Sequence, residues 1–239
     1  MNKLEGKTVV VVGATGGIGS ATVDALVKAG ANVAMMARTI DRLETKWREL
    51  GSPEKVIWFA GDASDTESVE NIFSETENRF KSVDGVFISI GDWEQNFSTD
   101  DPEELEASKK RLRESLVTSV GHIAKRAVES FEKNPGAIIH ISSHVVHKSE
   151  SELPGNHVYR EMKQEAERIL NGYRTEQIQV ANLRPSIVNT PKNERVLTKN
   201  GLDCRSGAVA PETIANWVVN NLGNPNAQVI VKFESDIII

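Results

Sequence analysis

A tyrosine and a lysine stand one helical turn apart in the segment NHVYREMKQEAERIL, residues 156–170. On an α-helix, the side chains of Tyr159 and Lys163 would project from the same face. Tyrosine has a reference pKa of about 10, and a neighbouring ammonium favours its phenolate form. Such a pair can give a proton to a substrate oxygen and take it back. The same spacing also occurs on solvated helices, so the pair indicates catalysis only together with a cofactor site.

A glycine-rich turn supplies the first sign of that cofactor. Residues 13–19 read GATGGIG and directly follow the β-branched run TVVVV. Glycine lets backbone amides approach a phosphate, and the N-terminus of the following helix adds a partial positive charge. No Lys-Ser or Lys-Thr follows the glycines, so the turn is not a P-loop for phosphoryl transfer. The turn predicts a dinucleotide site with contacts from Gly13, Thr15, Gly17, Ile18 and Gly19.

The end of the second strand-like run indicates which dinucleotide is bound. This run ends MMART, so Arg38 and Thr39 stand where an acidic residue would hydrogen-bond the ribose of NAD. An acid there would repel a 2′-phosphate, whereas an arginine can hold one through charge-assisted hydrogen bonds. Arg38 and Thr39 therefore favour NADP(H) over NAD(H).

Strand-like and helical stretches alternate along the whole chain. Seven apolar runs are expected as strands, and they lie within residues 7–13, 32–38, 55–62, 83–91, 136–143, 178–185 and 227–233. One long helix is expected from an N-cap at Asp101 to about residue 133, with Pro102 at its first position. Parallel strands need crossovers of this length. The pattern predicts an α/β fold in which residues 1–239 form a single-domain, Rossmann-like, doubly wound parallel sheet with helices on both faces. Residues 186–210 are expected to form a polar loop that covers the substrate.

The glycine turn, the alternating sheet and the Tyr159-x-x-x-Lys163 pair together resemble the short-chain dehydrogenase/reductase family, classical branch. Gly13, Gly17 and Gly19 match the Gly-x-x-x-Gly-x-Gly turn of that branch. Gly13, Gly16 and Gly19 would also fit the turn of the extended branch, which includes epimerases and dehydratases. Extended members carry a sizeable extra C-terminal region that these 239 residues lack, so the classical branch is expected.

The resemblance implies roles for individual residues. Tyr159 would be the general acid and base, Lys163 would tune it and hold the ribose, and Ser143 would bind the carbonyl oxygen, with Ser142 as the alternative. Thr118, or Ser119, stands where the family has the asparagine of its catalytic tetrad. The other implied cofactor contacts are Asp62 and Ala63 near the adenine, Gly91 after the fourth strand, and Pro185, Val188 and Thr190 at the nicotinamide end.

The implied activity is that of an NADP(H)-dependent oxidoreductase of the ketoreductase type, which transfers hydride between the nicotinamide and a carbonyl or alcohol substrate. Two departures from the family pattern keep a second interpretation open. Thr118 replaces the tetrad asparagine, and ISIG replaces the usual NNAG after the fourth strand. The alternative is a cofactor-binding protein with little or no catalysis, acting as a redox sensor or partner subunit.

Composition limits the remaining function classes. A formal net charge of −6 argues against a nucleic-acid or anionic-membrane partner, and no apolar run is long enough to cross a bilayer. The single Cys204 fits a reducing, cytoplasmic compartment. His144 and His147 lack a third ligand for a metal, and they are candidates for the mouth of the substrate site. Family analogy implies a homodimer or homotetramer acting on a small molecule.

Overall fold

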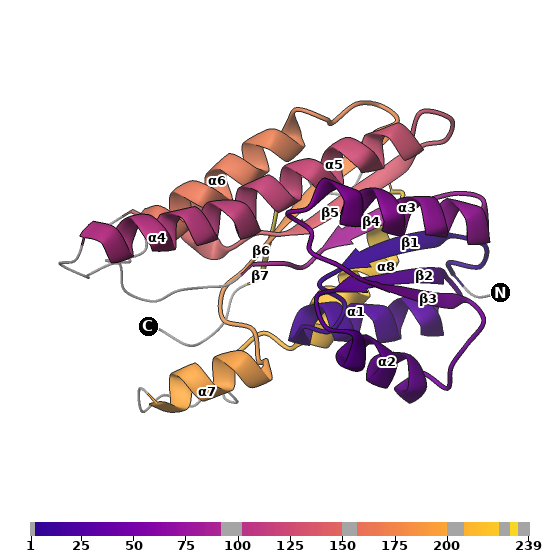
Figure 1. Cartoon of the computed structure of the whole chain (residues 1–239), viewed down its shortest axis with the longest axis horizontal. Helices are drawn as coiled ribbons and strands as arrows, with labels where there is room; N and C mark the ends of the chain where they lie inside the picture. Colours follow the sequence, from indigo (N-terminus) through magenta and orange to yellow (C-terminus); the bar gives the residue numbers. More distant parts are fainter. Residues whose placement is uncertain (1–2, 92–101, 150–156, 200–207, 225–229, 234–239) are drawn as a thin grey trace.

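A computed structural model describes residues 3–91, 102–149, 157–199, 208–224 and 230–233. Seven parallel strands form one sheet in the order β3-β2-β1-β4-β5-β6-β7. Their bounds are β1 Thr8–Val12, β2 Asn32–Ala37, β3 Val56–Ala60, β4 Gly85–Ile88, β5 Gly136–Ile141, β6 Ile178–Pro185 and β7 Ile230–Phe233. The predicted Rossmann-like, doubly wound parallel sheet is confirmed (Figure 1).

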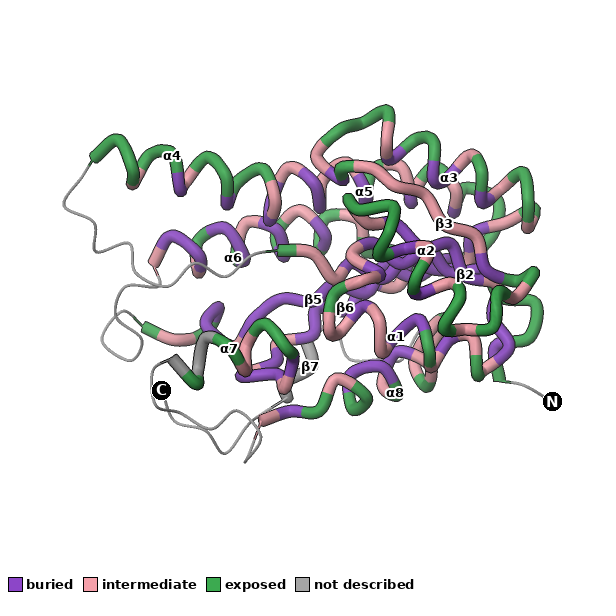
Figure 2. Tube along the Cα trace, turned by 60° about the horizontal axis from the view of Figure 1, so that its bottom comes forward, coloured by how far each residue is buried: buried purple, intermediate pink, exposed green. Residues whose placement is uncertain are grey.

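Helices cover both faces of the sheet, which is why the strands are almost continuously apolar. Helices α1 (Gly17–Lys28), α2 (Ile40–Glu49) and α8 (Pro211–Asn221) bury side chains in one core, together with residues such as Val9, Val11 and Ile139. Helices α3 (Thr66–Phe80), α5 (Ser119–Ser130) and α6 (His157–Asn171) pack on the other face, where Val10 and Ile138 point. Figure 2 shows the buried sheet between these two helical layers, which are exposed mainly on their outer sides.

The reversal of strand order beside β1 creates the position for a ligand. From β1 the chain builds outward through β2 and β3, and it then returns to place β4 on the other side of β1. In open α/β sheets, ligands bind at the carboxyl ends of the strands beside such a reversal. The glycine turn and the ends of β4 and β5 lie at this point.

The long helix expected before β5 is divided by a wider turn. Helix α4 (Pro102–Arg113) runs into a π-helical segment, η1 (Glu114–Thr118), before α5 begins. Within this turn the Ser119 hydroxyl donates to the carbonyl oxygen of Glu114, five residues earlier, at 2.9 Å. A π-helical turn adds one residue to the helix and shifts which side chains face the sheet. The predicted N-cap, Asp101, lies outside the described residues.

The expectation of a polar loop over residues 186–210 is wrong for part of this segment. Residues 191–199 form a helix, α7 (Pro191–Lys199), with Pro191 at its first position. The Thr190 hydroxyl oxygen accepts from the backbone amide of Asn193 at 3.3 Å, as an N-cap residue does. Val188 and Val209 form a bridge at the base of the segment, where the Asn189 amide donates to the Val209 carbonyl oxygen at 2.9 Å. The described helices include none with both the length and the apolar character needed to span a membrane.

Candidate active site

A cavity of about 1300 Å³ lies at the carboxyl ends of the strands. The glycine turn, the end of β2 and the first half of α6 contribute to one continuous wall. Among the residues predicted for the site, all but Gly19 and Thr118 line this cavity: Gly13, Thr15, Gly17, Ile18, Arg38, Thr39, Asp62, Ala63, Gly91, Ser143, Tyr159, Lys163, Pro185, Val188 and Thr190. The fold therefore brings a candidate cofactor site and a candidate proton donor together.

The glycine turn packs so closely against its neighbours that two of its glycines have no room for a side chain. Gly13 has φ +83°, and a Cβ on it would lie 2.2 Å from the carbonyl oxygen of Ser89. A Cβ on Gly19 would lie 2.1 Å from the Gly13 oxygen, so Gly19 packs α1 against the turn instead of lining the cavity. Gly16, the N-cap of α1, provides no side-chain hydrogen bond to the first amides of the helix. This uncapped N-terminus fits the pyrophosphate of a dinucleotide.

Two arginines from the β2–α2 region lie near the turn, at the end where the adenine is predicted. Arg38 lines the cavity, and the Arg42 guanidinium donates to the Thr15 carbonyl oxygen at 2.7 Å. Asp62 accepts hydrogen bonds from the Ser64 amide and hydroxyl at 2.8 and 2.7 Å. These bonds, with the nearby charge of Arg38, lower the pKa of Asp62. Sequence reasoning missed Arg42, although its position in the first turn of the helix that follows Arg38 was a usable signal.

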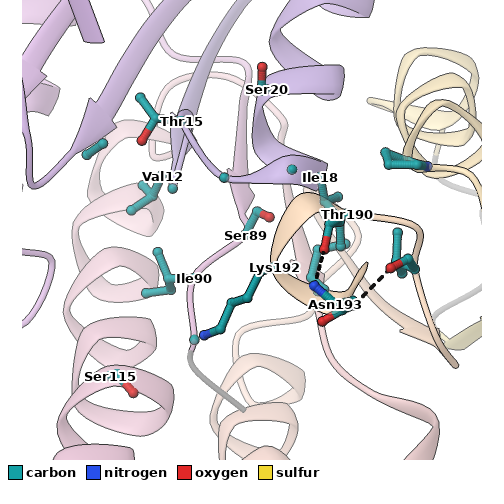
Figure 3. Close-up of a pocket in the computed structure, with 18 of the residues that line it drawn as sticks. Val12, Thr15, Ile18, Ser20, Ser89, Ile90, Ser115, Thr190, Lys192 and Asn193 are labelled. Carbon is teal, nitrogen blue, oxygen red and sulfur yellow. Dashed lines mark hydrogen bonds between the residues drawn. The ribbon is translucent and has the colours of Figure 1, made fainter. Parts of the chain in front are cut away.

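Residues 188–190, which lead into α7 and are called the α7 stem below, lie against the glycine turn. A Cβ on Gly17 would lie 2.5 Å from the Thr190 methyl group, so the two segments are in close contact. The Asn193 side-chain amide donates to the Val188 carbonyl oxygen at 2.8 Å and fixes the stem. Figure 3 shows Thr190 beside Ile18, with Asn193 below it. Asn193 was not predicted, because its helix was not.

The three candidate catalytic side chains are all buried at the cavity wall. Tyr159 is 9% exposed, Ser143 8% and Lys163 2%. The Lys163 ammonium donates to the Ile141 carbonyl oxygen at 2.8 Å and lies 6.0 Å from the centre of the Tyr159 ring. The Ser143 hydroxyl oxygen accepts from the Val145 amide at 3.4 Å. A phenol, a hydroxyl and an ammonium thus border one space, which is the set needed to bind and protonate a carbonyl oxygen.

Burial sets the electrostatics around Lys163. It lowers the pKa of Lys163 to about 8, and the carboxylate of Glu167 opposes this effect. Behind Lys163, His140 is fully buried, and its Nδ1 lies 3.0 Å from the Asn182 side-chain oxygen. Burial and, secondarily, the charge of Lys163 lower the pKa of His140 to about 3. Near pH 7, Lys163 is therefore mostly charged and His140 is neutral.

The π-helical turn changes which side chain reaches the cavity at the position of the family's tetrad asparagine. Ser115 and Ser119 line the cavity, whereas Thr118 does not. Of the two candidates for this position, the geometry favours Ser119. Gly91, with φ +130°, faces the same region, and a Cβ there would lie 2.3 Å from the Leu116 side chain and 3.6 Å from the Lys163 ammonium. The bare backbone at Gly91 therefore leaves room for both neighbouring side chains.

Of the two histidines predicted for the mouth of the site, only one lines the cavity. His144 lines the cavity in the 3₁₀-helix η2 (His144–His147), whereas His147 does not line it. Arg111 and Lys192 also line the cavity and were not predicted. No group of three or more potential metal ligands occurs among the residues that the structure describes.

Comparison with known proteins agrees with this geometry. The family model for short chain dehydrogenase matches residues 7–201. A farnesol dehydrogenase from Aedes aegypti is 29% identical over 240 residues, covering 94% of this chain and 93% of the relative. A glucose/ribitol short-chain dehydrogenase/reductase from Brucella melitensis has a similar crystal structure, with a TM-score of 0.83, 21% identity and coverage of 96% of this chain and 95% of that one. A short-chain dehydrogenase/reductase mutant from Serratia marcescens gives a TM-score of 0.81 at 22% identity, covering 97% of each chain.

Proposed function

The chain belongs to the short-chain dehydrogenase family, and we propose that it is an NADP(H)-dependent ketoreductase in which Tyr159 is the general acid and base. Family membership makes it an NAD(P)-dependent oxidoreductase of alcohols or carbonyl compounds. The observation that supports the finer proposal is the position of Tyr159, Lys163 and Ser143 on the wall of the cavity that also contains the glycine turn.

The cavity fits a nicotinamide dinucleotide. The glycine turn excludes side chains at Gly13, and the first amides of α1 have no side-chain cap. The pyrophosphate would be held by this turn, and Thr190 and Val188 would lie toward the nicotinamide. When bound, the cofactor supplies or accepts the hydride.

The chain's own residues would handle the substrate oxygen and its proton. The Ser143 hydroxyl would donate a hydrogen bond to the carbonyl oxygen and orient it. The Tyr159 phenol would give its proton to that oxygen in reduction and take a proton from the alcohol in oxidation. The Lys163 ammonium favours the phenolate that remains after proton transfer, because opposite charges stabilise each other in a partly dry site.

The preference for NADP(H) rests on Arg38 with Arg42. Arg38 lines the adenine side of the cavity, and Arg42 is tied to the glycine turn through the Thr15 carbonyl. Asp62, which accepts hydrogen bonds from Ser64, contributes one negative charge against the two arginines. Two guanidinium groups beside one ionised carboxylate favour a 2′-phosphate.

We also propose that the protein assembles as a homodimer or homotetramer, which is typical of the family. Light scattering coupled to size-exclusion chromatography measures this directly. A monomer at micromolar concentration would contradict it.

Turnover with a substrate panel tests the proposed activity. The protein is mixed with NADPH or NADH and with ketones, aldehydes and quinones, including the aldehyde of farnesol, and cofactor absorbance at 340 nm is followed. Cofactor fluorescence measures binding in parallel. The proposal expects consumption of NADPH with at least one carbonyl compound. Tight NADPH binding without turnover on any member would instead support the non-catalytic interpretation.

A further inference from the structure

A polar ridge on α6 continues beyond the candidate catalytic pair. Residues 163, 167 and 171 recur every four positions, so their side chains follow one face of the helix. Each makes a polar contact with the sheet. The Lys163 ammonium donates to the Ile141 carbonyl oxygen at 2.8 Å, and the Asn171 side-chain oxygen accepts from Asn182 at 3.1 Å. Between them, Glu167 accepts two hydrogen bonds from the guanidinium of Arg184 on β6.

The middle contact is a buried ion pair. The Glu167 side chain is 6% exposed and the Arg184 side chain 12%. Glu167 is the only acidic residue among the buried residues of the described chain. Burying such a pair costs desolvation, and apolar side chains of similar volume often pack equally well. A role in anchoring α6 to the sheet does not by itself require these charges.

The groups around Lys163 make Glu167 its main electrostatic partner. On α6, one turn away in either direction, lie Tyr159 and Glu167. From β5, His140 faces the same helical layer, but its Nδ1 pairs with the Asn182 oxygen and the ring is neutral. From η1, Glu114 lines the cavity from an exposed position. On β6, the Arg184 guanidinium is hydrogen-bonded to both carboxylate oxygens of Glu167.

We propose that Glu167, held in place by Arg184, is a positioning residue that keeps the Lys163 side chain charged and directed at the end of β5. The inference rests on the proposed function, in which a charged Lys163 acts on Tyr159. Burial opposes this charge and lowers the pKa of Lys163 to about 8, and the carboxylate of Glu167 is the group that counters the loss. Without Glu167, the ammonium would lose its proton closer to neutral pH, and the site would lose its cation.

The test measures the titration of Lys163 directly. Lysine labelled with ¹³C at the ε carbon is followed by NMR from pH 6 to 11, and the Lys163→Met variant assigns the signal. Glu167→Gln is expected to lower the pKa of Lys163 by about one pH unit. The alkaline limb of the kcat profile should move to lower pH by the same amount, and Glu167→Asp should restore most of it. Glu165→Gln is the matched control, because Glu165 lies on the same helix and pairs with Arg113 at the surface. It should leave both readouts unchanged.

A double variant keeps the test decisive if Glu167→Gln fails to fold with Arg184 unpaired. Glu167→Met combined with Arg184→Met replaces the pair by apolar side chains of similar length. A lowered pKa of Lys163 in this folded variant supports the proposal, and a pKa equal to that of the wild type overturns it. Failure of the proposed reaction is distinguishable: no carbonyl compound would be reduced, while the NMR titration would still report the coupling between Glu167 and Lys163.

Discussion

At the scale of single residues, the candidate site combines burial with charge. Lys163 is 2% exposed, and burial lowers its pKa to about 8, so it titrates far closer to neutrality than an exposed lysine. Ionisable groups whose pKa is shifted by burial in this way cluster at functional sites. Ser143 and Tyr159 are nearly as buried. Low solvent exposure strengthens the electrostatic interactions that these side chains make.

Cofactor choice is tested at Arg38. Arg38→Gln removes a charge-assisted hydrogen bond worth about 1.5–3 kcal/mol, so the Kd for NADPH should rise roughly 10- to 150-fold. The Kd for NADH should stay nearly constant, because that cofactor has no 2′-phosphate. Titration of cofactor fluorescence measures both values. Arg48→Gln, an exposed arginine on α2 that pairs with Glu44, is the control. Equal weakening of both cofactors by Arg38→Gln would rule out a 2′-phosphate contact.

Most lining residues could be predicted because the motifs lie at strand ends, and the fold places strand ends together. The glycine turn, Arg38, Ser143 and Tyr159 are examples. The choice between Thr118 and Ser119 could not be made, because a π-helical turn changes the phase of the helix by one residue. Its mark in the structure is the hydrogen bond from the backbone amide of Ser119 to the carbonyl oxygen of Glu114, five residues earlier.

At the scale of elements, the cavity depends on how closely α1 and the α7 stem approach the glycine turn. Gly19 brings α1 against the turn, and Gly17 brings the Thr190 stem against α1. The glycine pattern predicted the turn, but it gave Gly19 as a cofactor contact and not as the residue that packs α1 against the turn. Sequence reasoning did not predict α7, although TPKNE in residues 190–194 combines an N-cap threonine with a proline at the first helical position. The polar composition of residues 186–210 led to the prediction of a loop, despite these local signals for a helix.

A pair of alanine substitutions tests the first contact. Gly19→Ala places a Cβ 2.1 Å from the Gly13 oxygen, so the backbone must shift. The free energy of unfolding should fall by about 2 kcal/mol or more, and cofactor affinity should fall with it. Gly121→Ala is the control, because that helical glycine has no atom within 4 Å of the new Cβ. It should stabilise the protein by roughly 0.5–1 kcal/mol. Urea denaturation measures both, and an unchanged midpoint for Gly19→Ala would contradict the close packing.

At the scale of the whole molecule, the ionisable groups buried behind the site lower the stability of the folded protein in acid. His140 has a pKa of about 3 in the folded protein, against an ordinary value of 6.5. Below pH 6.5 the unfolded chain binds a proton at His140 that the folded chain does not bind. The folded state is therefore destabilised as pH falls from 6.5 toward 3. His140, which is buried behind Lys163, therefore limits the stability of the protein at acidic pH.

This linkage predicts a pH-dependent difference between the wild type and His140→Asn. Two pH units below 6.5, at pH 4.5, the wild type should have lost about 2.7 kcal/mol of unfolding free energy through His140 alone. The variant lacks this contribution, so its stability should fall less between pH 7 and pH 4.5 by that amount. Urea denaturation of both proteins at the two pH values measures the difference. Parallel losses would show that the imidazole is protonated in the folded state.

The central assignment, a phenol that moves the substrate proton, is tested most directly by exchanging each tyrosine in turn. The chain has two tyrosines, and Tyr173 lies outside the cavity lining. With the carbonyl substrate that the panel identifies, Tyr159→Phe should lower kcat by about 10²–10⁴-fold, the contribution of a general acid. NADPH affinity should stay close to that of the wild type, and Tyr173→Phe should keep full turnover. A Tyr159→Phe protein that reduces the substrate at the wild-type rate would contradict the account.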